Sequence, residues 1–221
     1  MINRKIFVGV AVPTVFLAVA LVLFCQNYSL YFFSDDFDRY SAYNWPSSEW
    51  MAYYNATSSG NGIYFTPGII PGKSLKIHGS PSGCWEATAA REVPYIRKLL
   101  IKARVMRQDI QPGCHTRGCL IGLAWALTPT GADGITLFDL ADNGDIRGFG
   151  NKIGEWETGK WYNVTIRMDY ESKWAIFRIN GYWKGKYYYT GTVEPYRYLV
   201  LNSGNGTSWF DDMLLIETEL Q

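Results

Sequence analysis

The feature that most limits the fold of this chain is a two-residue alternation of apolar and polar side chains. In the run Trp161–Tyr170 (WYNVTIRMDY) every second residue is apolar, and Lys98–Met106 (KLLIKARVM) repeats the pattern. Successive side chains of a strand point to opposite faces, so such a strand buries one face and exposes the other. The alternation therefore predicts half-buried antiparallel strands rather than helices.

Short runs of this kind recur along the chain, separated by Gly, Asn, Asp and Pro, which is typical of an all-β protein. The predicted strands are Ser74–Ile77, Trp85–Val93, Lys98–Met106, Cys119–Leu127, Ile135–Leu140, Ile146–Phe149, Trp161–Tyr170, Trp174–Asn180, Tyr196–Asn202 and Trp209–Glu217. Asn143-Gly144 and Asn180-Gly181 favour type I′ turns and so predict hairpins. No linker divides the region, so we expect one domain over residues 31–221, with two sheets around a full core.

The composition excludes two classes of protein. A formal net charge of +1 excludes a strongly basic nucleic-acid binder. An aromatic content of 16% excludes wholesale disorder, because such a chain has ample apolar surface to bury. Charged residues make up 19% of the chain, below the usual ~25%, which fits two sheets that bury many faces.

An uncharged N-terminal run predicts a membrane segment. Ile6–Cys25 contains no charged residue and is about as long as the ~20 residues needed to cross a bilayer. Two basic residues precede the run and none follows until Arg39. By the positive-inside rule we expect an uncleaved signal-anchor helix within residues 1–30, with a cytoplasmic N-terminus and an extracellular domain. The alternative is a signal peptide cleaved after Ala18-Val19-Ala20.

Export would permit glycosylation. The N-x-[S/T] motif predicts acceptor sites at Asn55, Asn163 and Asn205. Because the motif is short, some matches arise by chance.

Export would also favour a disulfide. The glycine-flanked segment from Cys114 to Cys119 predicts a disulfide that closes a small loop. Pairing of Cys84 with either of the two is one alternative. A zinc site formed by the three cysteines and His115 is another, although their spacing matches no known ligand pattern.

Three further segments lie at the start, centre and end of the expected domain: Phe33–Phe37 (FSDDF) with Gly72–Ile77, Gly159–Gly181, and Ser208–Ile216 (SWFDDMLLI). In this order and spacing they resemble the concanavalin A-like lectin/glucanase superfamily, specifically its laminin-G-like jelly rolls. The resemblance covers residues 33–217. It implies a two-sheet antiparallel jelly-roll sandwich, a fold that hosts lectins, adhesion modules, hydrolases and lyases.

The resemblance also implies a position for a metal ion. In this superfamily the first and last strands commonly pair, which would bring Asp35 and Asp36 close to Asp211 and Asp212. Calcium binds several carboxylate and carbonyl oxygens. We therefore expect these four residues as candidate calcium ligands.

Aromatic side chains in loops or at strand edges are candidates for stacking on sugar rings. The predicted carbohydrate-binding residues are Trp45, Trp50, Trp183, Tyr187, Tyr188 and Tyr189. By contrast, the basic stripe of Lys98, Lys102 and Arg104 is interpreted as a solvated face.

Catalytic motifs are weak. Hydrolases of this fold carry two carboxylates on one strand face as Glu-x-Asp-x-Glu, and the chain lacks that spacing. We expect a membrane-anchored, extracellular carbohydrate-binding or adhesion module without catalytic activity, whose partner is a glycan or a cell-surface glycoprotein. The alternatives are a glycoside hydrolase or lyase on the same fold, and a structural cell-surface component.

Overall fold

The computed structural model describes residues 32–53, 60–68, 72–79, 86–109, 118–128, 131–204 and 206–218. Within these ranges all regular secondary structure is β-strand, which confirms the all-β prediction. No helix long and apolar enough to span a bilayer occurs in the part of the chain that the structure describes. The predicted membrane segment, residues 1–30, lies outside the described residues.

The strands form two antiparallel sheets, which we call sheet A and sheet B. Sheet A has the order β13-β12-β11-β6-β15-β4-β3, and β1 pairs with β15. Its strands are β1 (Phe32–Asp35), β3 (Gly62–Phe65), β4 (Lys73–Gly79), β6 (Lys98–Arg107), β11 (Trp161–Asp169), β12 (Trp174–Ile179), β13 (Tyr182–Tyr188) and β15 (Gly206–Glu217).

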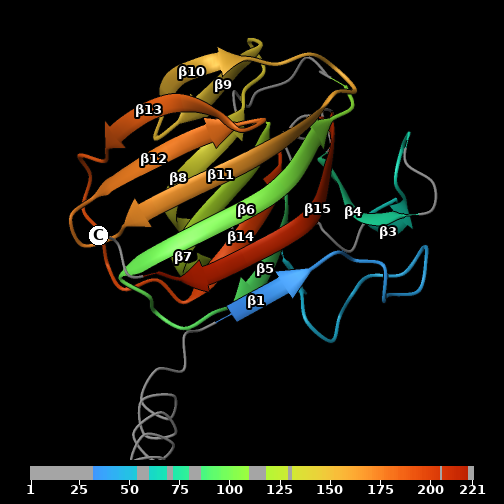
Figure 1. Ribbon diagram of the computed structural model, residues 1–221. Helices are drawn as coiled ribbons and strands as arrows, with labels where there is room; N and C mark the ends of the chain where they lie inside the picture. Colours follow the sequence, from blue (N-terminus) through green and yellow to red (C-terminus); the bar gives the residue numbers. More distant parts are fainter. Residues whose placement is uncertain are drawn as a thin grey trace, which may run out of the picture. The chain divides into compact units, whose positions relative to one another are not determined.

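Sheet B has the order β10-β9-β8-β7-β14-β5-β2. Its strands are β2 (Met51–Tyr53), β5 (Ala87–Glu92), β7 (Cys119–Thr128), β8 (Gly131–Leu140), β9 (Asp145–Gly148), β10 (Asn151–Glu155) and β14 (Tyr198–Ser203). Figure 1 shows the long strands of sheet A side by side in front of the strands of sheet B. The predicted strands are confirmed to within a few residues at their ends, and β1, β2, β3, β10 and β13 are additional.

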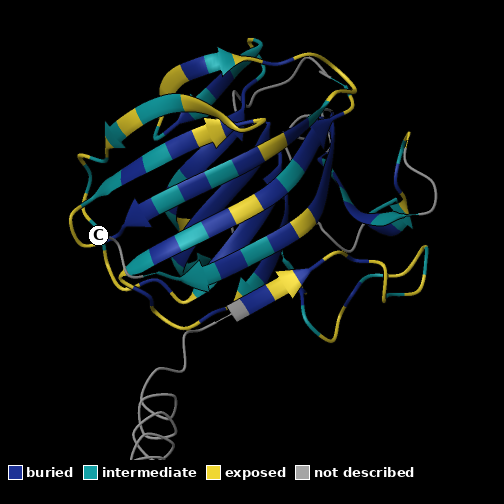
Figure 2. Cartoon of the chain, in the orientation of Figure 1, coloured by how far each residue is buried: buried dark blue, intermediate teal, exposed yellow. Residues whose placement is uncertain are grey.

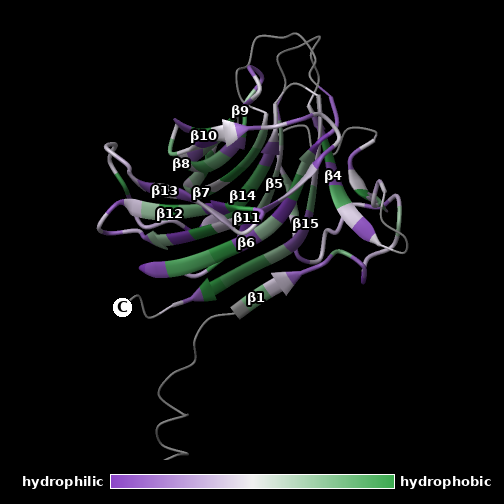
Figure 3. Cartoon of the chain, turned by 45° about the horizontal axis from the view of Figure 1, so that its top comes forward, coloured by the Kyte–Doolittle hydropathy of each residue, from purple (hydrophilic) through white to green (hydrophobic). Residues whose placement is uncertain are grey.

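The core lies between the two sheets. Along β11, Tyr162, Val164, Ile166 and Met168 are buried while the residues between them are more exposed as far as Arg167, as the alternation predicted. Figure 2 shows the same alternation along β6 and β12. In Figure 3 the hydrophobic residues concentrate in the central strands of both sheets.

The first and last strands of the domain pair, as the resemblance implied. β1 runs antiparallel to β15, with Asp35 opposite Met213 and Ser34 opposite Leu214. β15 also pairs with β6 and β4 and so lies inside sheet A. The pairing ties the N-terminal end of the domain to its C-terminal strand.

Candidate functional site

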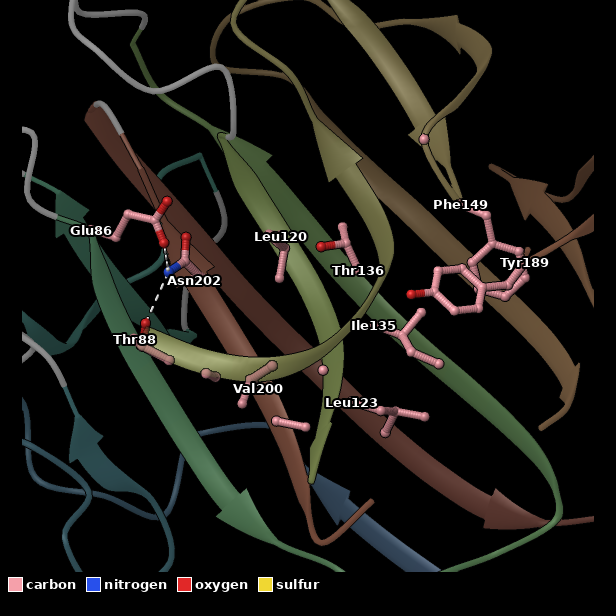
Figure 4. A pocket seen from close by; sticks show the side chains of 14 residues that line it. Glu86, Thr88, Leu120, Leu123, Ile135, Thr136, Phe149, Tyr189, Val200 and Asn202 are labelled. Carbon is pink, nitrogen blue, oxygen red and sulfur yellow. Dashed lines mark hydrogen bonds between the residues drawn. The ribbon is translucent and has the colours of Figure 1, made fainter. Parts of the chain in front are cut away.

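A cavity of about 300 Å³ lies on sheet B, lined by β5, β7, β8 and β14. Figure 4 shows its polar and aromatic side chains at opposite ends. Glu86, Thr88 and Asn202 form the polar end, and Phe149 and Tyr189 form the aromatic end. The apolar side chains between them include Leu120, Ile135 and Val200.

Strand alternation places Asn202 in this cavity. The neighbouring Ser203 faces sheet A, because its Oγ lies 2.9 Å from Oγ of Ser208 on β15. Asn202 therefore points to the opposite face of sheet B. In the register of the sheet it lies directly beside Thr88 of β5 and Leu120 of β7, so these three side chains share the cavity face.

Two hydrogen bonds fix the direction of the Asn202 amide. Its Nδ2 donates to Oε2 of Glu86 at 3.0 Å and to Oγ1 of Thr88 at 2.8 Å. A carboxylate oxygen only accepts, so the nitrogen must be the atom that faces Glu86. The carbonyl oxygen Oδ1 consequently points away from both partners.

The carbonyl oxygen of Asn202 is the atom of the site that most directly indicates a ligand. Asn202 is only 6% exposed, and its Oδ1 is buried without a hydrogen-bond partner among the described residues. An unsatisfied buried acceptor costs about 1–3 kcal/mol. A ligand hydroxyl that donates to Oδ1 would recover this free energy.

The aromatic end is built on a strained turn. Phe149 and Gly150 connect β9 to β10 with φ values of 48° and 78°, the positive values that a type I′ turn requires. A bulky residue with positive φ is rare and costs stability, and such outliers cluster at functional sites. The Phe149 ring packs against Phe177, and its centroid lies 5.8 Å from that of Tyr189.

The predicted carbohydrate-binding residues of the β12–β13 hairpin lie in three different environments. Tyr189 lines the cavity. Tyr187 packs against Phe177 of the core. Trp183 and Tyr188 are 58% and 61% exposed, but they lie on β13 of sheet A and do not line the cavity.

The prediction for Trp50 is wrong. Its side chain is fully buried, with 0% exposure, and its Nε1 donates to Oδ2 of Asp35 at 2.9 Å. A ring buried on all sides cannot stack on a sugar. Trp45 is half-buried and donates from Nε1 to the carbonyl oxygen of Trp50 at 2.7 Å, away from the cavity on sheet B.

Asp35 receives hydrogen-bond donors from several directions. Besides Trp50, its carboxylate accepts from the Tyr40 hydroxyl at 2.8 Å and from the backbone N–H of Phe37 at 3.0 Å. The guanidinium of Arg91, on sheet B, lies 3.9 Å away. The buried carboxylate thus links sheet A to sheet B and to the loop that carries Trp50. Burial and the Asp35 carboxylate also raise the pKa of Tyr40 to about 12.

The remaining candidate calcium ligands face other partners. Asp36 accepts from the backbone N–H of Asp38, and Asp211 and Asp212 lie 3.4 and 3.3 Å from Arg104. Burial raises the pKa of Asp211 to about 7. Across the described ranges, no group of three or more His, Cys, Asp or Glu side chains is arranged to hold a metal ion. Calcium binding stays a prediction.

The structure does not show the predicted disulfide. Cys119 is a free thiol that is fully buried, and Cys114 lies outside the described residues, as do Asn55 and Asn205. Asn163 is exposed on β11, and its glycosylation stays a prediction.

The sequence analysis missed Glu86, Thr88, Asn202 and Phe149. One signal was present: Asn202 is a polar residue in the otherwise apolar run Tyr198–Asn202 (YLVLN). The sequence around Glu86, Thr88 and Phe149 shows no comparable pattern, because their proximity to Asn202 depends on how the strands pair.

No protein-family model matches the chain, and no curated protein matches it. Several solved structures are similar. "Cellulose induced protein, Cip1" has a TM-score of 0.58 at 13% identity, covering 85% of this chain and 98% of that one. A structure from work on endo-acting O-glycanases of the human gut microbiota has a TM-score of 0.53 at 13% identity, covering 85% and 99%.

A sialidase is similar with a TM-score of 0.52 at 16% identity, over 78% of this chain. The chain spans only 19% of the length of that sialidase. At these identities the likeness shows the fold. The chain has the two-sheet antiparallel β-sandwich fold of these solved structures.

Proposed function

We propose that this chain is a concanavalin A-like jelly-roll module that binds a carbohydrate in the cavity on sheet B without catalysing a reaction on it. The observation that carries the proposal is the carbonyl oxygen of Asn202, a residue that lines the cavity, because this oxygen is buried without a hydrogen-bond donor among the described residues. Sugar hydroxyls are the donors that such an acceptor needs.

The two ends of the cavity contact different parts of a sugar. At the polar end, Asn202 Oδ1 accepts from one hydroxyl, and the Glu86 carboxylate holds the amide in the accepting orientation. At the aromatic end, the rings of Phe149 and Tyr189 offer apolar surface to the C–H face of a sugar. A volume of about 300 Å³ is at the small end of ligand sites, which suits one or two sugar units.

The proposal gives Glu86 an orienting role. Glycosidases of the two-carboxylate type hold a pair about 5–9.5 Å apart, one on each side of the scissile bond. Among the described residues that line the cavity, Glu86 is the one carboxylate. Release of reducing sugar from a bound glycan would replace the binding proposal by the hydrolase alternative.

We further propose that the domain is displayed outside a membrane on a signal-anchor helix, where its partner is a glycan or a cell-surface glycoprotein. Support comes from the uncharged run Ile6–Cys25 and the basic residues before it. Protease treatment of intact cells tests this arrangement. Digestion of the domain on intact cells is expected, and protection until lysis would contradict it.

A glycan array tests the carbohydrate proposal. The full-length protein is compared with Asn202→Leu, which has a similar branched shape but lacks the carbonyl oxygen. We expect a discrete set of glycans to bind the wild type and to lose most of their signal with the variant. Absence of any bound glycan, or equal binding by both proteins, would overturn the proposal.

A further inference from the structure

Sheet A carries a second candidate site on the face that points away from sheet B. A hollow of about 640 Å³ lies over β6, β11, β12 and the edge strand β13. Its lining combines three cations, Lys102, Arg167 and Arg178, with the exposed ring of Trp183. None of these residues lines the cavity on sheet B, so the two sites are independent.

The strand register arranges most of these side chains in one row. Lys102 is the direct partner of Thr165, Thr165 of Arg178, and Arg178 of Trp183. Neighbouring strands lie about 4.8 Å apart, so the row extends over roughly 14 Å. Arg167 lies two residues along β11 from Thr165, on the same face.

The three cations have no anionic partner among the described residues. The side chains of Lys102, Arg167 and Arg178 form no ion pair or hydrogen bond within the part of the chain that the structure describes. Every other arginine described there lies within salt-bridge distance of a carboxylate. Arg167 lies diagonally to Lys102 and to Arg178 on neighbouring strands of one face, so an anion bound there would reduce their mutual repulsion.

A smaller hollow of about 280 Å³ continues this surface toward β15. It shares Lys102 and Thr165 with the larger one and adds Arg104, which pairs with Asp211 and Asp212. The combined surface is therefore elongated across five strands and carries its unpaired positive charge in the middle. An extended anionic chain fits such a surface better than a compact anion.

We infer that this face of sheet A binds an acidic polysaccharide. Carboxylate or sulfate groups pair with Lys102, Arg167 and Arg178, and planar guanidinium groups suit such anions because they can donate two parallel hydrogen bonds. One sugar ring of the polymer stacks on Trp183. The stripe that includes Lys102 is then a binding surface, rather than the solvated face that the sequence indicated.

The test uses the full-length protein from a bacterial host, so that Asn163, exposed on the same face, carries no glycan. The probes are polygalacturonate, which supplies carboxylates, dextran sulfate, which supplies sulfates, and neutral dextran. We expect at least one acidic polymer to bind, and its affinity to fall about tenfold or more between 50 and 300 mM salt, because binding releases counterions. Neutral dextran should not bind to this face.

Two variants and a matched control locate the binding. Arg178→Gln is expected to weaken polymer binding about fivefold or more, and Trp183→Ala to weaken it by a similar factor. Arg197→Gln is the control, because Arg197 is also exposed but pairs with Glu92. It removes the same charge and should change binding less than about twofold. All three variants should keep the melting temperature of the wild type.

Three outcomes would overturn the inference. The first is failure of both acidic polymers to bind. The second is equal loss in Arg178→Gln and Arg197→Gln, which would indicate a response to net charge alone. The third is tighter binding, with the same dependence on Arg178, to phosphatidylglycerol vesicles or to duplex DNA than to either polymer.

Discussion

The side-chain nitrogen of Asn202 lies 3.0 Å from a carboxylate oxygen of Glu86, and this contact orients the amide. The two residues are 116 positions apart in the sequence and come together because β14 pairs with β5. With the nitrogen held by Glu86 and Thr88, the carbonyl oxygen is left without a donor among the described residues. Recognition of a hydroxyl therefore depends on both residues, although we expect only Asn202 to accept a hydrogen bond from it.

Glu86→Gln tests this orienting role. A glutamine can donate as well as accept, so the Asn202 amide can turn and present its nitrogen to the ligand. We expect glycan affinity to fall about five- to tenfold, the effect of one hydrogen bond. Glu92→Gln is the control, since Glu92 lies at the far end of β5, the strand that Glu86 precedes, and is exposed and pairs with Arg197. Equal affinity of Glu86→Gln and wild type would contradict the role.

Tyr189→Ala tests the aromatic end of the cavity. Loss of the ring removes apolar contact with the sugar, so we expect about tenfold weaker binding, or about 1.4 kcal/mol. Tyr189→Phe should retain most of the affinity. Tyr182→Ala, which removes a ring that is 74% exposed on β13, should leave glycan binding unchanged. A loss in Tyr182→Ala as large as that in Tyr189→Ala would place the sugar elsewhere.

Asp35→Asn is expected to destabilise the fold. Asp35 is a buried acceptor for donors from Trp50, Tyr40 and Phe37, and removing a buried charge from its partners costs about 3 kcal/mol or more. For a domain of this size that corresponds to a melting temperature lower by about 6–12 °C. Asp36→Asn, which removes one exposed contact, should change it by less than about 3 °C.

The same experiment addresses calcium. If Asp35 acts as an acceptor of hydrogen bonds, its loss should lower the melting temperature equally with and without a chelator. A loss seen only in the presence of calcium, and shared by Asp36→Asn, would instead support the metal site predicted from the sequence.

Asp211 should make stability depend on pH. Burial raises the pKa of Asp211 from the ordinary 3.8 to about 7 with a smaller contribution from the Asp212 charge, and the hydrogen bond from the Asp212 backbone N–H and the Arg104 charge offset only part of this. Between these two values the folded state holds a proton that the unfolded chain has released. The free energy of unfolding contributed by Asp211 therefore falls as the pH rises from about 4 to 7.

Asp211→Asn removes this contribution. In urea unfolding we expect the variant to gain stability relative to the wild type between pH 5 and pH 8. Glu92→Gln is the control, because Glu92 is an exposed carboxylate on the other sheet. An unchanged difference between Asp211→Asn and wild type at the two pH values would show that Asp211 is ionised throughout.

Much of the fold was predictable because the signal is local. The alternation in β6 and β11 marks strands whatever their neighbours, and Asn180-Gly181 marks the turn before β13. Trp50 is different. Trp50 follows a polar, turn-rich segment, so the sequence suggests an exposed side chain. In the structure it is buried, and its indole N–H donates to Asp35 on β1. The burial of Trp50 follows from a tertiary contact that no periodicity reveals.

The candidate site was less predictable for a related reason. Tyr189 was found because aromatic residues in loops are conspicuous in a sequence. Glu86, Thr88 and Asn202 come from separate parts of the chain, and only the register of β14 with β5 places them together. An asparagine in an apolar strand signals a special role, but not the identity of its partners.

Monodeoxy analogues of a glycan found on the array test the central claim most directly. Their dissociation constants are measured for the wild type and for Asn202→Leu, which gives a double-mutant cycle between one hydroxyl and one side chain. We predict that one analogue binds the wild type about fivefold or more weakly than the parent glycan, and that this difference vanishes in Asn202→Leu. Equal losses in both proteins for every analogue would contradict hydroxyl recognition by Asn202.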